Sequence, residues 1–230
     1  MPAALQVIRV FAKQSVLPRQ TMAALAPPEF VAVLEQLYRE RTLTPYPAGQ
    51  VISLRLDELL IICRGVVQLS TIQPDGGETL LGLAGPSMPV GLPLTTVDPY
   101  WVTALTDVDV LPLAMTEVEQ SPELMAGVCR HLILRLQQTE AWLALAGKRL
   151  VADRLRHLLH LIAQEFGQVE PQGVRIPVRL THHQLATATG TTRVTVTRLL
   201  KEFKQEGWLR THQRYLILSI DQFAPAPYGW

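Results

Sequence analysis

The sequence predicts an α+β protein in which a β-rich domain, a long helix and a winged helix-turn-helix domain follow one another. Three observations support this class. Short apolar runs alternate with turn residues over 49–114, a proline-free helical pattern spans 123–150, and two short helices around Gly190 precede a hairpin pattern at 208–220. The predicted domains are therefore 1–120, 121–150 and 151–230.

Composition allows this organisation and argues against a membrane protein. The chain has 230 residues, of which 48% are hydrophobic and 18% charged, enough for one or two ordinary cores. The longest uncharged run, Thr79–Val97, is interrupted by prolines and glycines and will not form a spanning helix. The N-terminus lacks a basic stretch followed by an apolar run, so no signal peptide is expected. We expect a cytoplasmic protein with no membrane partner.

The N-terminal half is expected to contain one helix and then strands. The helix is predicted over 26–41, where prolines precede an apolar repeat and charges follow it. The sequence "PDGG" at 74–77 favours a hairpin turn, because glycine adopts positive φ at little cost. The strands expected around this turn are 51–56, 59–72, 78–84 and 100–114. Several short strands at this spacing predict a β-barrel or sandwich.

Residues 121–150 are predicted to form one long helix. Ser121 suits the N-cap, Pro122 suits the first helical position, and Glu123 favours the positive end of the helix dipole. Apolar residues then recur at three- and four-residue steps, and beside them lie Leu136, Leu143 and Leu150. One face can pack on the β domain and the other on a second copy of the helix. Burial of the whole helix within one chain is the alternative.

The C-terminal third is expected to alternate helices and hairpins. An amphipathic helix is predicted over 152–167, and a short hairpin with the turn "PQG" follows it. The pattern at 208–220 predicts a second hairpin beside the helices, in the position of a wing. Its side chains expected to touch a DNA backbone are Arg210, His212 and Arg214.

Residues 182–201 fit a helix-turn-helix. Ala186 is small where the second helix crosses the first, and Gly190 tolerates positive φ at the turn. Val196 is the apolar residue expected to face the first helix, and Thr189 stands where an apolar residue is more usual. The small core of the motif is completed by Leu185 and Leu199.

The second helix of this motif is predicted to read DNA. Arg193 and Arg198 carry the bidentate fork that recognises guanine O6 and N7, and Val194 suits a thymine methyl group. Short threonine hydroxyls and helix-end N–H groups can bind phosphates. A solvated basic face is the alternative. The predicted DNA-binding residues are Thr192, Arg193, Val194, Thr195, Thr197, Arg198, Lys201, His182 and His183.

Charge agrees with double-stranded DNA as a partner. Residues 175–221 hold eight basic against three acidic side chains, whereas the rest holds 13 basic against 17 acidic. No nucleophile–base pair, P-loop, zinc-protease motif or carboxylate pair stands in a recognisable frame, so no enzyme and no catalytic residue is expected. Cys63 and Cys129 lie in apolar contexts and are predicted to be buried structural thiols, with no metal site.

The domain order, over 45–222, resembles the CRP/FNR family of bacterial transcription regulators. "TTRVTVTRLL" at 191–200 and "RLQQTE" at 135–140 are most similar to its cyanobacterial global nitrogen regulator (NtcA) branch. The resemblance implies a jelly-roll β-domain like those that bind cyclic nucleotides, and a homodimer joined along the long helix. It also implies that Arg193, Val194 and Arg198 read a GTA…TAC palindrome, and that 170–174 contacts RNA polymerase.

The same resemblance implies an effector pocket formed by Gly91, Leu92, Pro93, Arg135, Thr139 and Glu140. The cAMP-binding pattern has a glutamate where Leu92 stands and Arg-Ser where the sequence reads Asp98–Pro99. Between Arg64 and Arg130 the chain has eight acidic residues and no lysine or arginine, so an anion would meet an acidic field.

We therefore expect no cofactor, no cAMP binding, and weak or no 2-oxoglutarate binding. Arg135 is expected at a subunit seam, where it either binds an anion or pairs with Glu140 of the other chain. Two alternatives stay open. In the first, the protein is a regulator that responds to 2-oxoglutarate. In the second, it binds an effector and acts mainly through contacts with other proteins.

Overall fold

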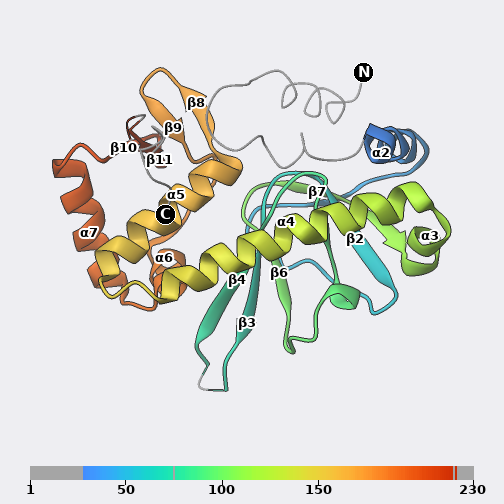
Figure 1. Ribbon diagram of the computed structural model, residues 1–230, viewed down its shortest axis with the longest axis horizontal. Helices are drawn as coiled ribbons and strands as arrows, with labels where there is room; N and C mark the ends of the chain where they lie inside the picture. The colour runs from blue at the N-terminus through green and yellow to red at the C-terminus, as the bar shows by residue number, and fades with distance from the viewer. Residues whose placement is uncertain (1–27, 75, 220, 222–230) are drawn as a thin grey trace. The chain divides into compact units, whose positions relative to one another are not determined.

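The computed structural model describes residues 28–74, 76–219 and 221. The first residues of the predicted domain 1–120 and helix 26–41, and the last of the predicted domain 151–230, lie outside the described residues. The chain divides into two compact units, and the division falls between Glu140 and Ala141, inside the long helix α4 (Figure 1).

The described part of the first unit contains two antiparallel sheets and three α-helices. Its sheets have the strand orders β1-β7-β2-β5 and β4-β3-β6. Its elements are α2 (Pro28–Glu40), β1 (Thr44–Tyr46), β2 (Glu58–Arg64), β3 (Val67–Ile72), β4 (Glu78–Ala84), β5 (Pro89–Val90), the 3-10 helix η2 (Leu92–Leu94), β6 (Trp101–Ala104), β7 (Val108–Ala114), α3 (Met115–Gln120) and most of α4 (Pro122–Ala146). The predicted β-rich domain followed by a long helix is confirmed.

Strand β2 explains why this part of the sequence is apolar without alternation. Leu60 and Ile62 point into the core between the two sheets, where they meet residues of β3 and β6. Leu59 and Ile61 point to the other face, where α2, α3 and α4 cover the sheet. A strand buried on both faces needs apolar residues at every position.

Three of the four predicted strands were wrong in part or in whole. The predicted strands 59–72 and 100–114 are each two strands, β2 with β3 and β6 with β7, because the chain turns at 65–66 and 105–107. Residues 51–56 form no strand, because their pairing is limited to the single bridge of Val51 to Thr103, with Ile52 N–H donating to the Val102 carbonyl oxygen, before the chain turns away. Strand β1 was missed because it contains Pro45 and is followed by Pro47, yet Pro45 is tolerated opposite Asp109 on the outermost strand of its sheet. A proline on an edge strand leaves no ladder hydrogen bond unmade inside the sheet.

Helix α4 has one buried face and one exposed apolar face. The Ser121 hydroxyl accepts a hydrogen bond from the Leu124 backbone N–H at 3.2 Å, so the predicted N-cap is confirmed. The helix ends at Ala146, four residues before the predicted end. Large apolar side chains that remain at least one-third exposed on it are Leu132, Ile133, Leu136 and Leu143.

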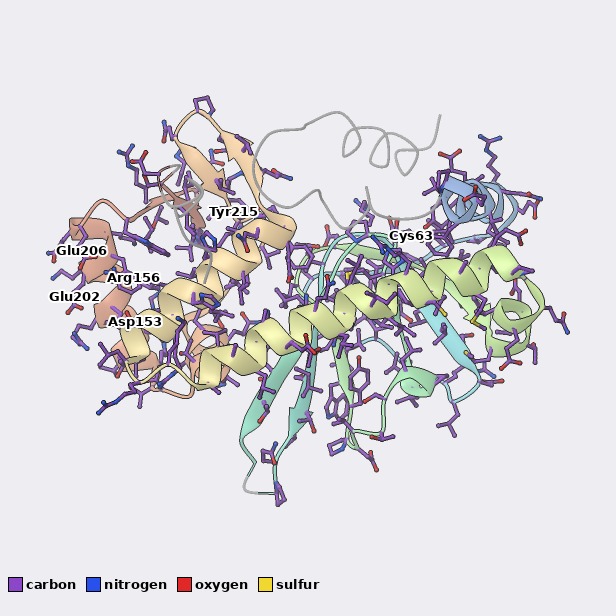
Figure 2. All side chains as sticks on the ribbon, in the orientation of Figure 1. Cys63, Asp153, Arg156, Glu202, Glu206 and Tyr215 are labelled. Atoms are coloured by element: carbon purple, nitrogen blue, oxygen red, sulfur yellow. The ribbon has the colours of Figure 1, made fainter. Side chains whose placement is uncertain are left out.

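The two cysteines differ in burial. Cys63 lies on β2, labelled in Figure 2, and is buried as predicted; burial raises the pKa of its thiol to about 12. Cys129 is exposed, so the prediction of a second buried thiol was wrong. Cys129 stands seven residues before Leu136, which places it on the exposed face of α4. Its apolar sequence context reflects that face rather than a core.

Gly127 of α4 is required by close packing against α2. A Cβ at position 127 would lie 1.9 Å from the nearest ring atom of the fully buried Phe30. We expect Gly127→Ala to lower the free energy of unfolding by about 1–3 kcal/mol, because the ring has no space to move into. Chemical denaturation measures this. Gly147→Ala is the control, since its Cβ would meet only the Ala144 carbonyl oxygen at 3.5 Å; an equal loss there would contradict the packing argument.

His131 of α4 is a buried neutral side chain. Its Nδ1 lies 2.9 Å from the Gly127 carbonyl oxygen and donates to it, and its Nε2 has no hydrogen-bond partner within the described chain. Burial lowers the pKa of His131 below the ordinary value of 6.5. A histidine with a lowered folded-state pKa stabilises the fold above its unfolded pKa, and this contribution is lost as pH falls.

We therefore expect the free energy of unfolding to drop as pH is lowered from about 7 to 5.5, and the drop to be smaller in His131→Leu. Denaturation curves at several pH values provide the measurement. An unchanged pH dependence in the variant would assign the acid sensitivity to other groups.

The second unit holds the C-terminal helices and hairpins. Its sheet has the order β10-β11-β9-β8. Its elements are α5 (Val151–Phe166), β8 (Gln168–Glu170), β9 (Gly173–Arg175), α6 (His182–Thr189), α7 (Arg193–Gln205), β10 (Leu209–His212) and β11 (Tyr215–Leu218). The predicted helix, both hairpins and the helix-turn-helix are confirmed. Among the described helices, none is long and apolar enough to cross a bilayer.

Candidate nucleic-acid interface

The turn between α6 and α7 is fixed by caps on both helices. Thr181 and Gln184 form a capping box at the start of α6. Gly190 ends α6 in the left-handed region, with φ 60° and ψ 49°, as the sequence predicted. Thr192 caps α7, accepting from the Thr195 backbone N–H at 3.2 Å. These local signals set where the second helix starts and therefore which side chains it exposes.

The inner face of α7 packs on α6 and α5. Val196, Leu199 and Leu200 are at most 4% exposed, as predicted. Thr189 is buried although it is polar, and its hydroxyl donates to the Leu185 carbonyl oxygen at 2.6 Å. A hydroxyl satisfied by its own helix removes the cost of burying it, so the motif tolerates threonine at this position.

The outer face of α7 is polar, basic and exposed. Val194 is 78% exposed, an unusual environment for an apolar side chain, and Arg193, Thr197 and Arg198 are exposed around it. The Arg198 guanidinium lies 2.5 Å from Glu202, four residues on along the helix. Such an exposed pair contributes little to stability, so Arg198 is free to exchange this carboxylate for another partner.

Arg154 of α5 holds the helix-turn-helix to the loop between α4 and α5. Its Nε donates to the Thr189 carbonyl oxygen at 2.9 Å, and its Nη1 donates to Lys148 and Arg149 carbonyl oxygens at 2.9 and 3.3 Å. No sequence signal could have found it, because an arginine in the first turn of an amphipathic helix is ordinarily solvated.

Arg156 on the next turn of α5 fixes the far end of α7. Its guanidinium lies 4.4 Å from the centroid of the Phe203 ring and 5.7 Å from that of Trp208. It also pairs with Glu206, labelled beside it in Figure 2. A cation held between two rings and a carboxylate fixes the helix end by stacking and charge together.

The start of α6 and the start of α7 enclose an open pocket of about 520 Å³. Thr181, His182, His183 and Arg193 line it. His182 is half-buried, with Nδ1 2.7 Å from the Thr197 Oγ1, and His183 is exposed. Burial, followed by the charges of Arg193 and Lys204, lowers the pKa of His182. Both predicted histidines therefore lie beside the exposed face of α7.

The second hairpin forms the predicted wing. Its tip residues Gln213 and Arg214 have positive φ, and Arg210 and His212 are exposed on β10. Tyr215, labelled in Figure 2, lies under two guanidinium groups, those of Arg175 at 5.0 Å and Arg179 at 5.1 Å.

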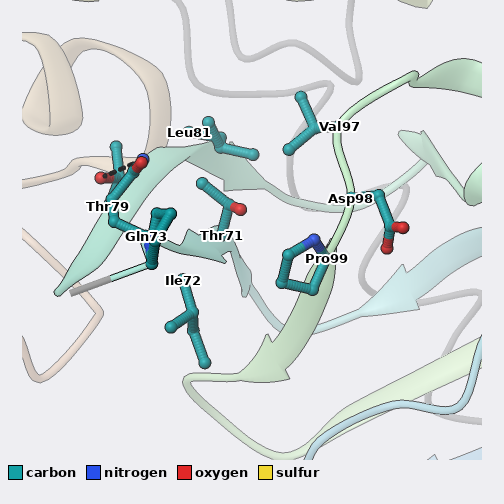
Figure 3. A pocket seen from close by; sticks show the side chains of 9 residues that line it. Thr71, Ile72, Gln73, Thr79, Leu81, Val97, Asp98 and Pro99 are labelled. Atoms are coloured by element: carbon teal, nitrogen blue, oxygen red, sulfur yellow. Dashed lines mark hydrogen bonds between the residues drawn. The ribbon is translucent and has the colours of Figure 1, made fainter. Parts of the chain in front are cut away.

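The first unit has a separate open pocket of about 560 Å³ between the β3–β4 hairpin and the loop before β6 (Figure 3). Its lining is Thr71, Ile72, Gln73, Pro74, Thr79, Leu81, Val97, Asp98 and Pro99. The one charged group on this lining is the Asp98 carboxylate, so its charge opposes an anionic ligand. None of the six predicted effector residues is among these lining residues.

The predicted effector residues instead fall into two groups. Gly91, Leu92 and Pro93 lie at η2, where a Cβ at Gly91 would approach the Glu58 carbonyl oxygen to 2.8 Å. The other three residues lie on α4. Thr139 and Glu140 are exposed there, and Arg135 is partly buried. The Thr139 hydroxyl is used within the helix, where it donates to the Arg135 carbonyl oxygen at 2.9 Å.

Arg135 contacts the backbone of its own chain, and its place at a subunit seam stays a prediction. Its Nη1 donates to the Leu83 carbonyl oxygen at 3.3 Å, and the Gln138 side chain donates to the same oxygen at 3.1 Å. Gly82 leaves the space, because a Cβ there would lie 3.3 Å from the Arg135 guanidinium carbon. The long side chain therefore reaches β4 of its own chain. Among the described residues, no group of His, Cys, Asp and Glu is arranged to hold a metal.

The fold and the capped, basic helix-turn-helix define a DNA-binding transcription regulator. A family model described as a Crp-like helix-turn-helix domain matches residues 153–225. The chain is 36% identical to the regulatory protein CysR of Synechococcus elongatus over 161 residues, which cover 69% of this chain and 74% of that protein. The chain belongs to the CRP/FNR family of bacterial transcription regulators.

Two further comparisons agree with this family. The chain is 29% identical to the global nitrogen regulator of a Nostoc species over 198 residues, covering 82% of this chain and 86% of that protein. A CRP-family transcriptional regulator from Thermus thermophilus has the same fold, with a TM-score of 0.66 and 24% identity over 78% of this chain and 94% of that one. These relatives are regulators, not enzymes, as the sequence predicted.

Proposed function

We propose that this chain is a homodimeric regulator that binds a palindromic GTA…TAC-like site through two copies of α7. The observation that carries this proposal is the exposed face of α7. Arg193 and Arg198 flank Val194 there, on a helix whose start is fixed by Thr192 and Gly190. Two forked donors around one apolar side chain suit guanine beside thymine in a major groove.

The remaining predicted DNA contacts fit phosphates rather than bases. Thr192 and Thr195 lie at the first turn of α7, with their hydroxyl oxygens 3.0 Å apart. Lys201 is exposed two turns further on, and His182 and His183 begin the neighbouring helix. Short hydroxyls, helix-end N–H groups and cations set the register of a protein on the duplex.

A second copy of the chain is the proposed partner of α4. Leu136 and Leu143 are 60% and 72% exposed and stand seven residues apart, on one face of α4. Apolar residues at this spacing form a two-stranded seam. A palindromic site requires such a pair, because each α7 reads only a short half-site.

The proposed regulator does not respond to cAMP, and its effector is absent or non-standard. The Asp98 carboxylate on the pocket lining opposes a phosphate or a dicarboxylate, and Arg135 is engaged with the Leu83 carbonyl oxygen. A 2-oxoglutarate-responsive regulator is the alternative, which the likeness to global nitrogen regulators favours. The proposal further includes a cytoplasmic location and a contact between RNA polymerase and the hairpin of β8 and β9.

Fluorescence anisotropy tests this function directly. The purified chain is titrated onto a labelled GTA…TAC palindrome and a scrambled duplex at physiological salt, alone and with 2-oxoglutarate or cAMP. Specific binding that neither ligand changes supports the proposal. Binding that appears only with 2-oxoglutarate would favour the alternative, and equal binding to both duplexes would refute sequence-specific recognition.

A further inference from the structure

His182 joins the two helices of the DNA-binding motif by a side-chain contact. It is the first residue of α6, and its Nδ1 lies 2.7 Å from the hydroxyl oxygen of Thr197 on α7. The same hydroxyl lies 2.9 Å from the Arg193 carbonyl oxygen. The Thr197 hydroxyl thus has two hydrogen-bond partners and only one hydrogen to donate.

This arrangement assigns the tautomer of His182. A carbonyl oxygen can only accept, so the Thr197 hydroxyl donates its hydrogen to Arg193 and accepts from the imidazole. Nδ1 therefore carries a hydrogen in neutral His182, and Nε2 carries the lone pair. A proton gained at Nε2 leaves both hydrogen bonds of Thr197 in place and gives the ring a second donor.

The groups around His182 disfavour protonation of its Nε2 in the free protein. Burial of the ring and the positive charges of Arg193 and Lys204, both on α7, lower the pKa of His182. The neighbouring side chain on α6 is His183, which lines the same pocket with Arg193 and Thr181. The charges that oppose protonation thus belong to the face that is proposed to meet DNA phosphates.

We propose that His182 takes up a proton at Nε2 when α7 docks on DNA, so that binding is coupled to pH through this side chain. This inference rests on the DNA-binding function proposed above. The proton comes from solvent, and the new Nε2–H donates to a phosphate oxygen. Phosphates neutralise Arg193 and Lys204 and attract the imidazolium, so bound DNA reverses the electrostatic opposition.

The sign of the effect follows from linkage. DNA raises the pKa of His182 relative to the free protein, and a complex that holds an extra proton becomes tighter as pH falls. We expect the affinity to rise about three- to tenfold for each half-site between roughly pH 8 and pH 6, since a shift of one pKa unit corresponds to tenfold, and therefore the dissociation constant of a dimer for the palindrome to decrease about ten- to hundredfold.

Anisotropy titrations across this pH range at constant ionic strength test the proposal, with His182→Gln and the control His183→Gln. The His182→Gln side chain keeps an N–H donor for Thr197 but cannot take up a proton, so its affinity should change little with pH. The control should keep the wild-type slope, whatever its absolute affinity. A slope lost in the control and kept in His182→Gln would overturn the assignment.

Calorimetry of the unmodified protein gives a second measurement that does not depend on a variant folding. Binding heats in two buffers of different ionisation enthalpy yield the protons taken up, and uptake on forming the complex is expected. Specific binding without proton uptake would overturn the role of His182 and leave the regulator function intact. Absence of specific binding at every pH would overturn both.

Discussion

Replacing Leu136 and Leu143 together by glutamate is expected to convert the proposed dimer into a monomer and to weaken palindrome binding by at least about a hundredfold, or about 2.7 kcal/mol. A dimer along α4 would bury both leucines of each chain, which are 60% and 72% exposed in the single chain. Full burial of one leucine is worth about 1.5–3 kcal/mol. Four glutamates at one seam would also repel each other.

Sedimentation velocity measures the oligomeric state of this variant, and anisotropy on the palindrome measures its affinity. Leu56→Glu is the matched control, because Leu56 is an 83% exposed leucine that lies on the loop before β2 and not on α4. The control should stay dimeric and bind normally. A double variant that remains dimeric would place the seam elsewhere.

Local sequence signals were sufficient to predict the helix-turn-helix. Gly190, Thr192 and Ala186 each act within a few residues of their own position, through positive φ, capping and close packing. The outward face of α7 then follows from helix periodicity alone. For this reason the sequence is sufficient to predict that Arg193, Val194 and Arg198 lie on the exposed face of α7.

Long-range contacts explain the predictions that were wrong. Residues 51–56 have strand periodicity, but a strand also needs a neighbouring strand along its length, and here pairing stops after the single bridge of Val51 to Thr103. The apolar context of Cys129 gave no information on whether a chain or solvent covers that face of α4. The direction of the Arg135 side chain could not be read from the sequence, because its partner, the Leu83 carbonyl oxygen, lies 52 residues away in sequence; its place at a subunit seam stays a prediction.

Arg193→Ala is expected to remove discrimination at one base pair in each half-site. A bidentate arginine–guanine contact is worth about 1–3 kcal/mol against the wrong base, so a symmetric dimer loses about 2–6 kcal/mol if the half-sites add. Arg193 suits this role because it is exposed in the first turn of α7. Anisotropy titrations measure the loss on three duplexes: the palindrome, a palindrome whose outer guanines are replaced, and a scrambled duplex.

Lys201→Ala provides the comparison that separates base reading from phosphate binding. Lys201 is exposed on the same helix, two turns after Arg193, and carries a single charge without a fork. Its removal should weaken binding to all three duplexes alike and reduce the salt dependence of binding, because a phosphate contact releases counterions regardless of sequence. Arg193→Ala should instead weaken the palindrome far more than the scrambled duplex. If both variants lose affinity equally on every duplex, Arg193 contacts a phosphate, and base reading then rests on Val194 and Arg198.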